Sequence, residues 1–247
     1  GAYPYAQGAG IRLGQSVGGV LRGHEYYLCG YSAVLDSAAI PAGMTARPLH
    51  HPDMRQPWEI HVNVRGERFV QEDVDSVDVR EHALLAQPDL RRWVIYDDAI
   101  ATASPAQFAD GDKESEMAYF GAHPMFTKAD TLDTLAEAAG IDARGLAASV
   151  AGYNDAIKND APDPMGRQHR PLPIEQGPFY AIRVQGTSIS STVGLAVDDS
   201  LQVIDQNNKA VANLFAAGEV LGSGQTMGDS FCGGMMATPA LTFGRLL

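Results

Sequence analysis

The carboxyl-terminal part of the chain holds the residues whose types and spacing indicate ligand binding. An apolar run of strand length ends at Gly218-Glu219, and a loop of small and polar residues then leads to the pair Gly233-Gly234, where we expect a helix to begin. Glycine lacks a Cβ, so the backbone can approach a ligand closely, and a helix N-terminus presents unpaired N–H groups to an electron-rich oxygen. The pattern predicts a backbone cradle for a flat, anionic ligand.

The order and spacing of this region resemble the carboxy-terminal flavin-binding segment of the fumarate reductase/succinate dehydrogenase flavoprotein superfamily. The stretches 214–222 and 232–244 carry the resemblance. It implies FAD as the cofactor, with Glu219 on the ribityl chain and the start of the following helix at the pyrimidine edge of the flavin. The cofactor-binding residues expected on this basis are Ser191, Gly218, Glu219, Cys232, Gly233, Gly234, Met235 and Met236.

A second match to the superfamily lies in the first half of the chain. Its Asn-x-x-Gly-x-Arg-Phe-x-x-Glu pattern is present here as Asn63, Gly66, Arg68, Phe69 and Glu72. The residues around it alternate between apolar and polar from Trp58 to Val64, which predicts a half-buried strand followed by a tight hairpin. We expect Arg68 and Glu72 to pair and hold the hairpin together.

Further elements are predicted by residue pattern. Two more strands are expected at 93–96 and 179–184, and the first is closed by Asp97-Asp98 at the start of a helix. Residues 130–140 are predicted as a short helix with acids in its first turn and a glycine stop. Asp142 is expected to cap the next helix, whose apolar face repeats at steps of four, three and four in Leu146, Val150, Tyr153 and Ile157.

Together these matches predict an α+β fold in which a capping domain packs with a remnant of the α/β FAD-binding domain. The expected divisions are 1–45 as a remnant of the FAD-binding domain leading into the cap, 46–185 as the capping (substrate) domain, and 186–247 as the carboxy-terminal segment of the FAD-binding domain. The stretch Gly8 to Gly14 looks like a dinucleotide fingerprint, but no predicted strand precedes it. Because the Rossmann part that holds the ADP half of FAD is missing, we expect a piece of a longer protein that by itself binds FAD poorly.

The resemblance implies that hydride moves between flavin N5 and a substrate carbon, while a protein group handles a proton on the neighbouring carbon. Three positions differ from the fumarate-reducing branch: Val74 to Asp78 replaces its proton-donating arginine, Ser190 replaces a histidine, and Phe231 replaces a carboxylate-binding arginine. We therefore expect a small-molecule substrate other than a small dicarboxylate, contacted by Ser190, Thr192 and Phe231. The end of the chain is also similar to 3-ketosteroid dehydrogenases, although Phe231 cannot titrate as the tyrosine there does.

The remaining groups suited to acid/base work are Arg80, His50, His51, Tyr119 and His123. Alternative interpretations stay open, since a histidine pair can be solvated on the surface and Tyr119 can belong to the core. A metal site at His50, His51 and Asp53 is not expected, because adjacent side chains on an extended backbone point to opposite faces.

Composition narrows the class of protein. The net charge of −12 over 247 residues argues against nucleic acid and anionic membranes as partners. No apolar run approaches the roughly 20 residues that span a bilayer, no leader precedes the first element, and the two cysteines, Cys29 and Cys232, are expected to be buried free thiols. These features predict a cytoplasmic protein, and the resemblance implies that it is an FAD-dependent oxidoreductase acting on a carbon–carbon bond next to a carbonyl or carboxyl group. The alternative is a stand-alone binding module that has lost its cofactor domain.

Overall fold

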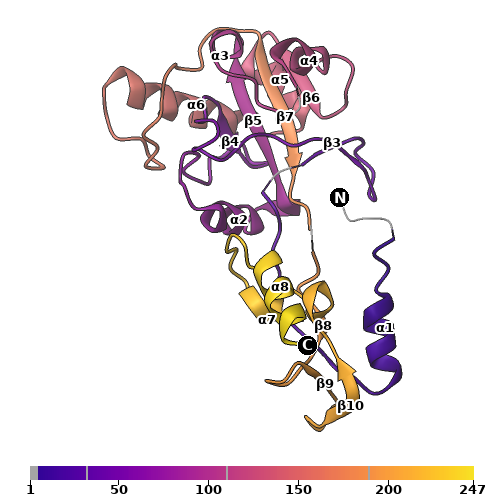
Figure 1. Ribbon diagram of the computed structural model, residues 1–247. Helices are drawn as coiled ribbons and strands as arrows, with labels where there is room; N and C mark the ends of the chain where they lie inside the picture. The colour runs from indigo at the N-terminus through magenta and orange to yellow at the C-terminus, as the bar shows by residue number, and fades with distance from the viewer. Residues whose placement is uncertain (1–4, 32, 110, 189) are drawn as a thin grey trace. The chain divides into compact units, whose positions relative to one another are not determined.

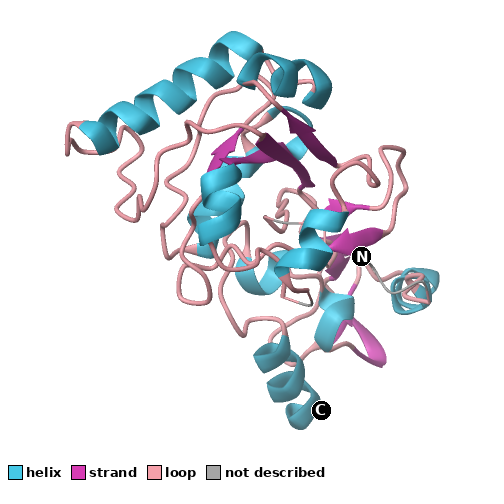
Figure 2. Cartoon of the chain, turned by 90° about the horizontal axis from the view of Figure 1, so that it is seen from above, coloured by secondary structure: helices cyan, strands magenta, loops and turns pink. Residues whose placement is uncertain are grey.

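The structure is a computed structural model that describes residues 5–31, 33–109, 111–188 and 190–247. The chain forms two compact units, one of residues 30–187 and one of residues 1–29 together with 188–247. Helices alternate with short antiparallel strands along the chain, so the fold is α+β (Figure 1). Figure 2 shows the same mixture coloured by the type of secondary structure.

The larger unit is organised on a four-stranded antiparallel sheet. Its strand order is β4 (Ile60–Val62), β5 (Arg91–Asp97), β7 (Phe179–Gln185) and β6 (Phe126–Ala129). Strands β5 and β7 pair along their whole length, from Arg91 opposite Gln185 to Asp97 opposite Phe179. A separate hairpin joins β2 (Val34–Leu35) to β3 (Met44–Ala46). The predicted strands at 93–96 and 179–184 are therefore confirmed.

Helices pack around this sheet and contribute apolar side chains to the core of the larger unit. In chain order they are α2 (Val77–Leu85), the 3₁₀ turn η1 (Pro88–Leu90), α3 (Asp98–Ala103), α4 (Lys113–Ala118), α5 (Leu132–Ala139) and α6 (Ala143–Lys158). Asp97 caps α3 and Asp142 caps α6, each by accepting a backbone N–H three residues later. Helix α6 buries Leu146, Val150 and Tyr153, as its periodicity predicts. Helix α5 packs against α6, β6 and β7.

The strand predicted from Trp58 to Val64 differs from expectation in its burial. Only β4 is regular, and the residues expected on a solvated face, Glu59, His61 and Asn63, are all buried. Each has polar partners inside the unit: the Glu59 carboxylate accepts two N–H bonds from Arg55, His61 Nδ1 lies 2.9 Å from the Tyr31 hydroxyl, and Asn63 Oδ1 accepts two backbone N–H groups. The alternation thus separates an apolar buried face from a polar buried face.

The pairing of Arg68 with Glu72 is confirmed. Nη2 of the arginine lies 2.6 Å from Oε2 of the glutamate, and the carboxylate is fully shielded from solvent. Arg167 approaches the same carboxylate at 3.7 Å and donates to the backbone carbonyls of Pro57 and Glu59. These contacts hold the hairpin against the segment that follows α6.

The smaller unit is built from both ends of the chain. Its elements are α1 (Ala9–Ser16), β1 (Leu21–Arg22), β8 (Gly194–Leu195), β9 (Gln202–Ile204), β10 (Ala210–Phe215), the 3₁₀ turn η2 (Gly218–Leu221), α7 (Gly224–Met227) and α8 (Ala237–Leu246). Strand β1 pairs with β8, and β9 pairs with β10. Leu195, Val203, Ala216 and Leu221 form its core.

The last helix begins later than predicted. Helix α8 starts at Ala237 instead of at Gly233, because the residues from Cys232 to Met236 form a turn in which Gly234 has φ +87°. Within this turn the Met235 N–H donates to the Cys232 carbonyl at 3.2 Å. In the part of the chain that the structure describes, no helix has the length and apolar character needed to cross a bilayer.

Candidate functional site

The site in the smaller unit is built where two backbone segments cross. Gly222 has φ +74°, and a Cβ on it would overlap the carbonyl oxygen of Thr192. Gly194 is equally restricted, because its Cβ would meet the backbone of Leu221. Hydrogen bonds fix the crossing: the Ser223 N–H donates to Ser191 O at 2.9 Å and the Gly224 N–H to Thr192 O at 3.0 Å. Glycine is needed at both positions for this approach.

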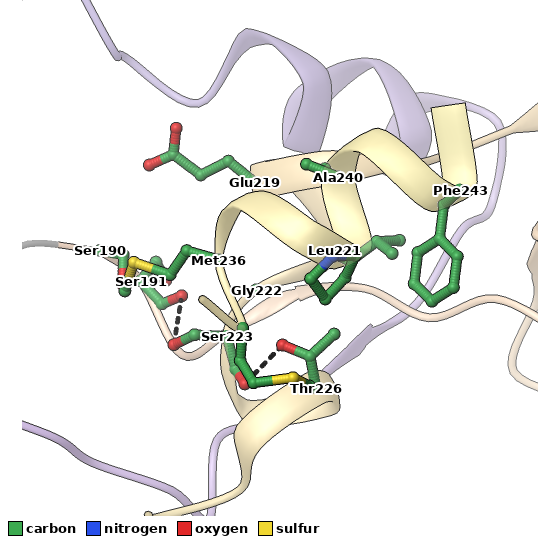
Figure 3. A pocket seen from close by; sticks show the side chains of 13 residues that line it. Ser190, Ser191, Glu219, Leu221, Gly222, Ser223, Thr226, Met236, Ala240 and Phe243 are labelled. Carbon is green, nitrogen blue, oxygen red and sulfur yellow. Dashed lines mark hydrogen bonds between the residues drawn. The ribbon is translucent and has the colours of Figure 1, made fainter. Parts of the chain in front are cut away.

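A cavity of about 300 Å³ opens beside this crossing, between η2, α7 and the start of α8 (Figure 3). Six of the residues predicted as cofactor or substrate contacts line it together: Ser190, Ser191, Gly218, Glu219, Met235 and Met236. In Figure 3 the Met236 side chain extends towards the two serines, and the Glu219 carboxylate extends outward from η2. The tertiary structure thus gathers residues from three separate stretches around one cavity.

Polar groups in the cavity lining and in the turn that leads into α8 suit an electron-rich, hydroxyl-bearing ligand. The Glu219 carboxylate is exposed and can accept hydrogen bonds. Among the described residues, no acceptor is recorded for the backbone N–H of Gly233, Gly234, Met236 or Ala237 at the start of α8. Such N–H groups at a helix N-terminus bind electron-rich oxygen. The residues present therefore fit the ribityl and pyrimidine parts of a flavin.

Several predicted residues lie outside the cavity lining. The Thr192 hydroxyl donates to the Tyr26 carbonyl at 2.9 Å, so it braces the backbone crossing. Phe231 is half-buried, and Gly233 and Gly234 are exposed in the turn before α8. Cys232 is also exposed there, so the expectation of a buried thiol is wrong for Cys232 and correct for Cys29.

Sequence reasoning missed part of the lining. The lining also includes Ser223 and Thr226, at the start of α7 and within it, and three residues of α8: Pro239, Ala240 and Phe243. Together with Met236, the α8 residues follow the i, i+3, i+4, i+7 spacing of one helix face. That spacing was available in the sequence as a signal.

The larger unit brings three of the predicted catalytic residues together. The rings of His50 and His51 stack with centroids 5.1 Å apart, and Nη2 of Arg80 donates to Nδ1 of His51 at 3.4 Å. The two histidines lie in a loop, so the expectation that their side chains point to opposite faces is wrong. Tyr119 lies elsewhere, stacked on Phe126 with centroids 4.8 Å apart.

The fourth catalytic candidate and its neighbour form a separate group. Tyr119 lines a cavity of about 100 Å³ together with Thr45 and the buried Glu116. His123 Nε2 lies 3.1 Å from the Thr45 hydroxyl, and the His123 ring packs edge-on against Tyr119. This group is mainly aromatic packing around Phe126.

Burial and positive charge keep the stacked histidines neutral. Burial and the charge of Arg92 lower the pKa of His50 to about 3, although its Nδ1 also donates to the Pro48 carbonyl at 2.8 Å. Burial and the charge of Arg80 lower the pKa of His51. A group with so low a pKa is a weak base at neutral pH. Both rings are therefore suited to hydrogen bonding in the neutral form.

Comparison with known proteins identifies the relatives of this chain. Residues 2–235 match the family model described as FAD binding domain. The chain is 30% identical over 204 residues to the probable fumarate reductase Ifc3 of Shewanella frigidimarina, covering 83% of this chain and 32% of that protein. It is 25% identical over 282 residues to the 4-oxocyclohexanecarboxylate 2-dehydrogenase of Sinomonas cyclohexanicum, covering 98% of this chain and 45% of that protein.

A solved structure agrees in fold. The 3-ketosteroid delta1-dehydrogenase of Sterolibacterium denitrificans, in complex with 1,4-androstadiene-3,17-dione, superposes with a TM-score of 0.74 at 21% identity, over 99% of this chain and 46% of that one. This likeness concerns the fold alone. The chain spans between about a third and a half of the lengths of these relatives.

Proposed function

The chain belongs to the FAD binding domain family, and from this membership we propose that the protein containing it transfers hydride between FAD and a carbon–carbon bond next to a carbonyl or carboxyl group. The observation that carries the proposal is the cavity in the smaller unit. It gathers Ser191, Glu219, Met235 and Met236, which the family resemblance implies as flavin contacts. In this proposal the smaller unit is part of the FAD-binding domain and the larger unit is the substrate-binding cap.

Each group of the cavity has a role in this proposal. FAD, when bound, supplies the centre that accepts or donates hydride. The Glu219 carboxylate accepts hydrogen bonds from the ribityl hydroxyls, and the backbone N–H groups of Gly233, Gly234, Met236 and Ala237 donate to the flavin oxygens. The side chains of Met235, Met236 and Phe243 exclude water from the apolar part of the cavity.

The substrate is proposed to be a small molecule other than a small dicarboxylate. Ser190 and Phe231 stand where the fumarate-reducing branch is expected to carry a histidine and an arginine, so two carboxylate-binding groups are replaced. Thr192 and Phe231 are also proposed as substrate contacts, although neither lines the cavity. Proton transfer is proposed for the larger unit, with Arg80, His50, His51 and Tyr119 as the groups to test.

Flavin binding by the full-length protein tests this proposal. The protein is expected to purify with flavin absorbance, or to acquire it on titration with FAD, and to bleach anaerobically with one member of a panel of ketones and carboxylic acids. A full-length protein without flavin, without FAD uptake and without flavin absorbance after refolding would contradict it. Binding of a small molecule by such a protein would instead support the alternative, a binding module without cofactor.

A further inference from the structure

Helix α6 of the larger unit presents one exposed face along its whole length. The residues Leu146, Val150 and Tyr153 lie on the opposite side of the helix and are buried in the core. The exposed residues recur within each turn of the helix and so form a single stripe. They are Arg144, Ala147, Ala148, Ala151, Asp155 and Lys158.

The charged residues of this face lie at its two ends, and two of them oppose the helix dipole. Arg144 is in the first turn of α6, and Asp155 is in the last turn, beside Lys158. A cation near the N-terminus and an anion near the C-terminus of a helix are both unfavourable, because the dipole is positive at the N-terminus. Among the described residues, no ion pair includes any of these three side chains. The charges of Arg144 and Asp155 thus have no stabilising role within their own helix.

The exposed face of α6 is complementary to itself when two copies of the helix run antiparallel. Arg144 and Asp155 lie equally far from the midpoint between residues 149 and 150. A two-fold axis at that midpoint therefore brings the arginine of each copy level with the aspartate of the other. The same axis brings Ala148 level with Ala151, and small side chains at these positions let two helices approach closely.

An open cavity of about 790 Å³ continues this face on one side of α6. Arg144, Ala148 and Gly152 line it from the helix, and nothing lies within 4 Å of the Cβ position of Gly152. The lining also includes Val64 and Met165, which are 37% and 36% exposed. A partner that covers the alanines of α6 therefore finds further apolar surface beside them.

We propose that the larger unit forms a symmetric dimer through α6, in which Arg144 of each copy pairs with Asp155 of the other. Each of these charges then lies beside the helix end of the other copy that attracts it, so the unfavourable placement within one helix becomes favourable between two. The 16 residues of α6 span about 24 Å, so a helix pair alone falls short of the roughly 1,000 Å² buried by a stable interface. The walls of the cavity contribute the rest, and we expect a reversible dimer with a Kd of about 10–100 µM.

Exchanging the two charges tests this pairing. Sedimentation equilibrium of the full-length protein should show a dimer, and Arg144→Asp and Asp155→Arg should each weaken it about tenfold or more, because like charges then meet twice in each dimer. The double variant with both replacements restores opposite charges, so its Kd should return to within about threefold of the wild-type value. Both replacements agree with the helix dipole, so each single variant should stay folded with unchanged or higher thermal stability.

A matched control separates this contact from general charge effects. Glu137→Arg changes the net charge as Asp155→Arg does, at an exposed position on α5, and should leave the dimer unchanged. A protein that stays monomeric at concentrations far above the expected Kd would overturn the proposal. A dimer that neither single variant weakens, or a double variant as weak as the single ones, would overturn it as well.

Cysteine cross-linking tests the antiparallel register. The exposed Cys232 is first replaced by serine. Under mild oxidation, an equal mixture of the Ala148→Cys and Ala151→Cys proteins should then cross-link faster than either protein alone, because the two-fold axis brings these positions level. Glu137→Cys is the control for random collisions and should cross-link more slowly than the mixture. Faster cross-linking within either single variant, or a rate equal to that of the control, would overturn the proposed arrangement.

Discussion

Arg68 and Asp163 lie 95 residues apart in the sequence, and Nη1 of the arginine contacts Oδ2 of the aspartate at 2.7 Å. Glu72 binds the same guanidinium at 2.6 Å. The arginine side chain is 5% exposed and both carboxylates are fully shielded, so all three charges depend on one another. The contact joins the hairpin after β4 to the segment after α6.

Removing the shared arginine should therefore destabilise the larger unit strongly. Arg68→Met removes the nearest positive charge from two buried carboxylates, and we expect the free energy of unfolding to fall by about 3–5 kcal/mol. The control Arg65→Met removes a pair that is more than half exposed, at 2.7 Å from Glu67, and should cost less than about 1 kcal/mol. Urea unfolding measures both, and equal losses would contradict the role given to Arg68.

The backbone crossing at Gly222 should tolerate no side chain. Gly222→Ala adds a Cβ against Thr192 O at a φ of +74°, so we expect a loss of about 2–5 kcal/mol in the stability of the smaller unit. Hydrogen exchange of the Ser223 and Gly224 amides, which donate across the crossing, reports the loss locally. Gly233→Ala is the control, because nothing lies within 4 Å of its Cβ position. Unchanged exchange in Gly222→Ala would show that the crossing is not rigid.

The carboxylate of Glu219 should contribute to FAD affinity in the full-length protein. Glu219→Gln keeps the size of the side chain but removes the charge that accepts from the ribityl hydroxyls, so we expect the Kd for FAD to rise about 10- to 100-fold. Quenching of flavin fluorescence measures it. Glu137→Gln, an exposed position on α5, should leave the Kd unchanged. If both variants bind alike, Glu219 does not contact the cofactor.

Acid should destabilise the larger unit through His50. Its pKa is lowered to about 3 in the folded chain from 6.5, so the unfolded chain binds more protons between these values. The contribution of His50 is thus fully present above pH 6.5 and is lost as the pH falls towards 3, at about 1.4 kcal/mol per pH unit. Burial lowers the pKa of His61 as well, which acts in the same direction.

A variant of His50 separates its contribution to the pH dependence from the opposite contribution of Glu81. Burial raises the pKa of Glu81 to about 7, so its contribution is complete below pH 4.5 and is lost as the pH rises to 7. His50→Asn keeps a donor for Pro48 but cannot titrate, so its unfolding free energy should depend on pH less steeply than that of the wild type, by about 1.4 kcal/mol per unit from pH 6 to 4. Urea titrations at several pH values measure the difference, and parallel slopes would show that His50 titrates normally.

A substitution at Phe231 tests which class of substrate the full-length protein accepts. Phe231→Arg in the full-length protein should raise the turnover of a small dicarboxylate, because a guanidinium fork binds a carboxylate that phenylalanine cannot. Steady-state rates with fumarate and with a monocarboxylate compare the two classes. An unchanged substrate range would mean that Phe231 does not occupy the position of the superfamily arginine.

Local structure was predictable wherever neighbouring residues decide it. Asp97 and Asp142 cap helices as predicted, and the spacing of Leu146, Val150 and Tyr153 identified the buried face of α6. The start of α8 was predicted three or four residues early, because the turn at Gly234 uses a positive φ that composition alone does not reveal. The polar residues Glu59 and His61 were expected in solvent, since their partners Arg55 and Tyr31 become visible only when the chain is folded.

The sequence by itself determined the family and the helix caps, because these depend on residue types at short and fixed spacings. Only the tertiary structure decided which of those residues share a cavity, and that His50, His51 and Arg80 meet. Only the fold revealed that Arg92, which directly precedes the strand predicted at 93–96, is fully buried on β5 and that its Nη1 and Nη2 have no hydrogen-bond acceptor among the described residues. Burial and counter-ion pairing arise from contacts between distant segments, and their energies depend on solvent exclusion that no local pattern encodes.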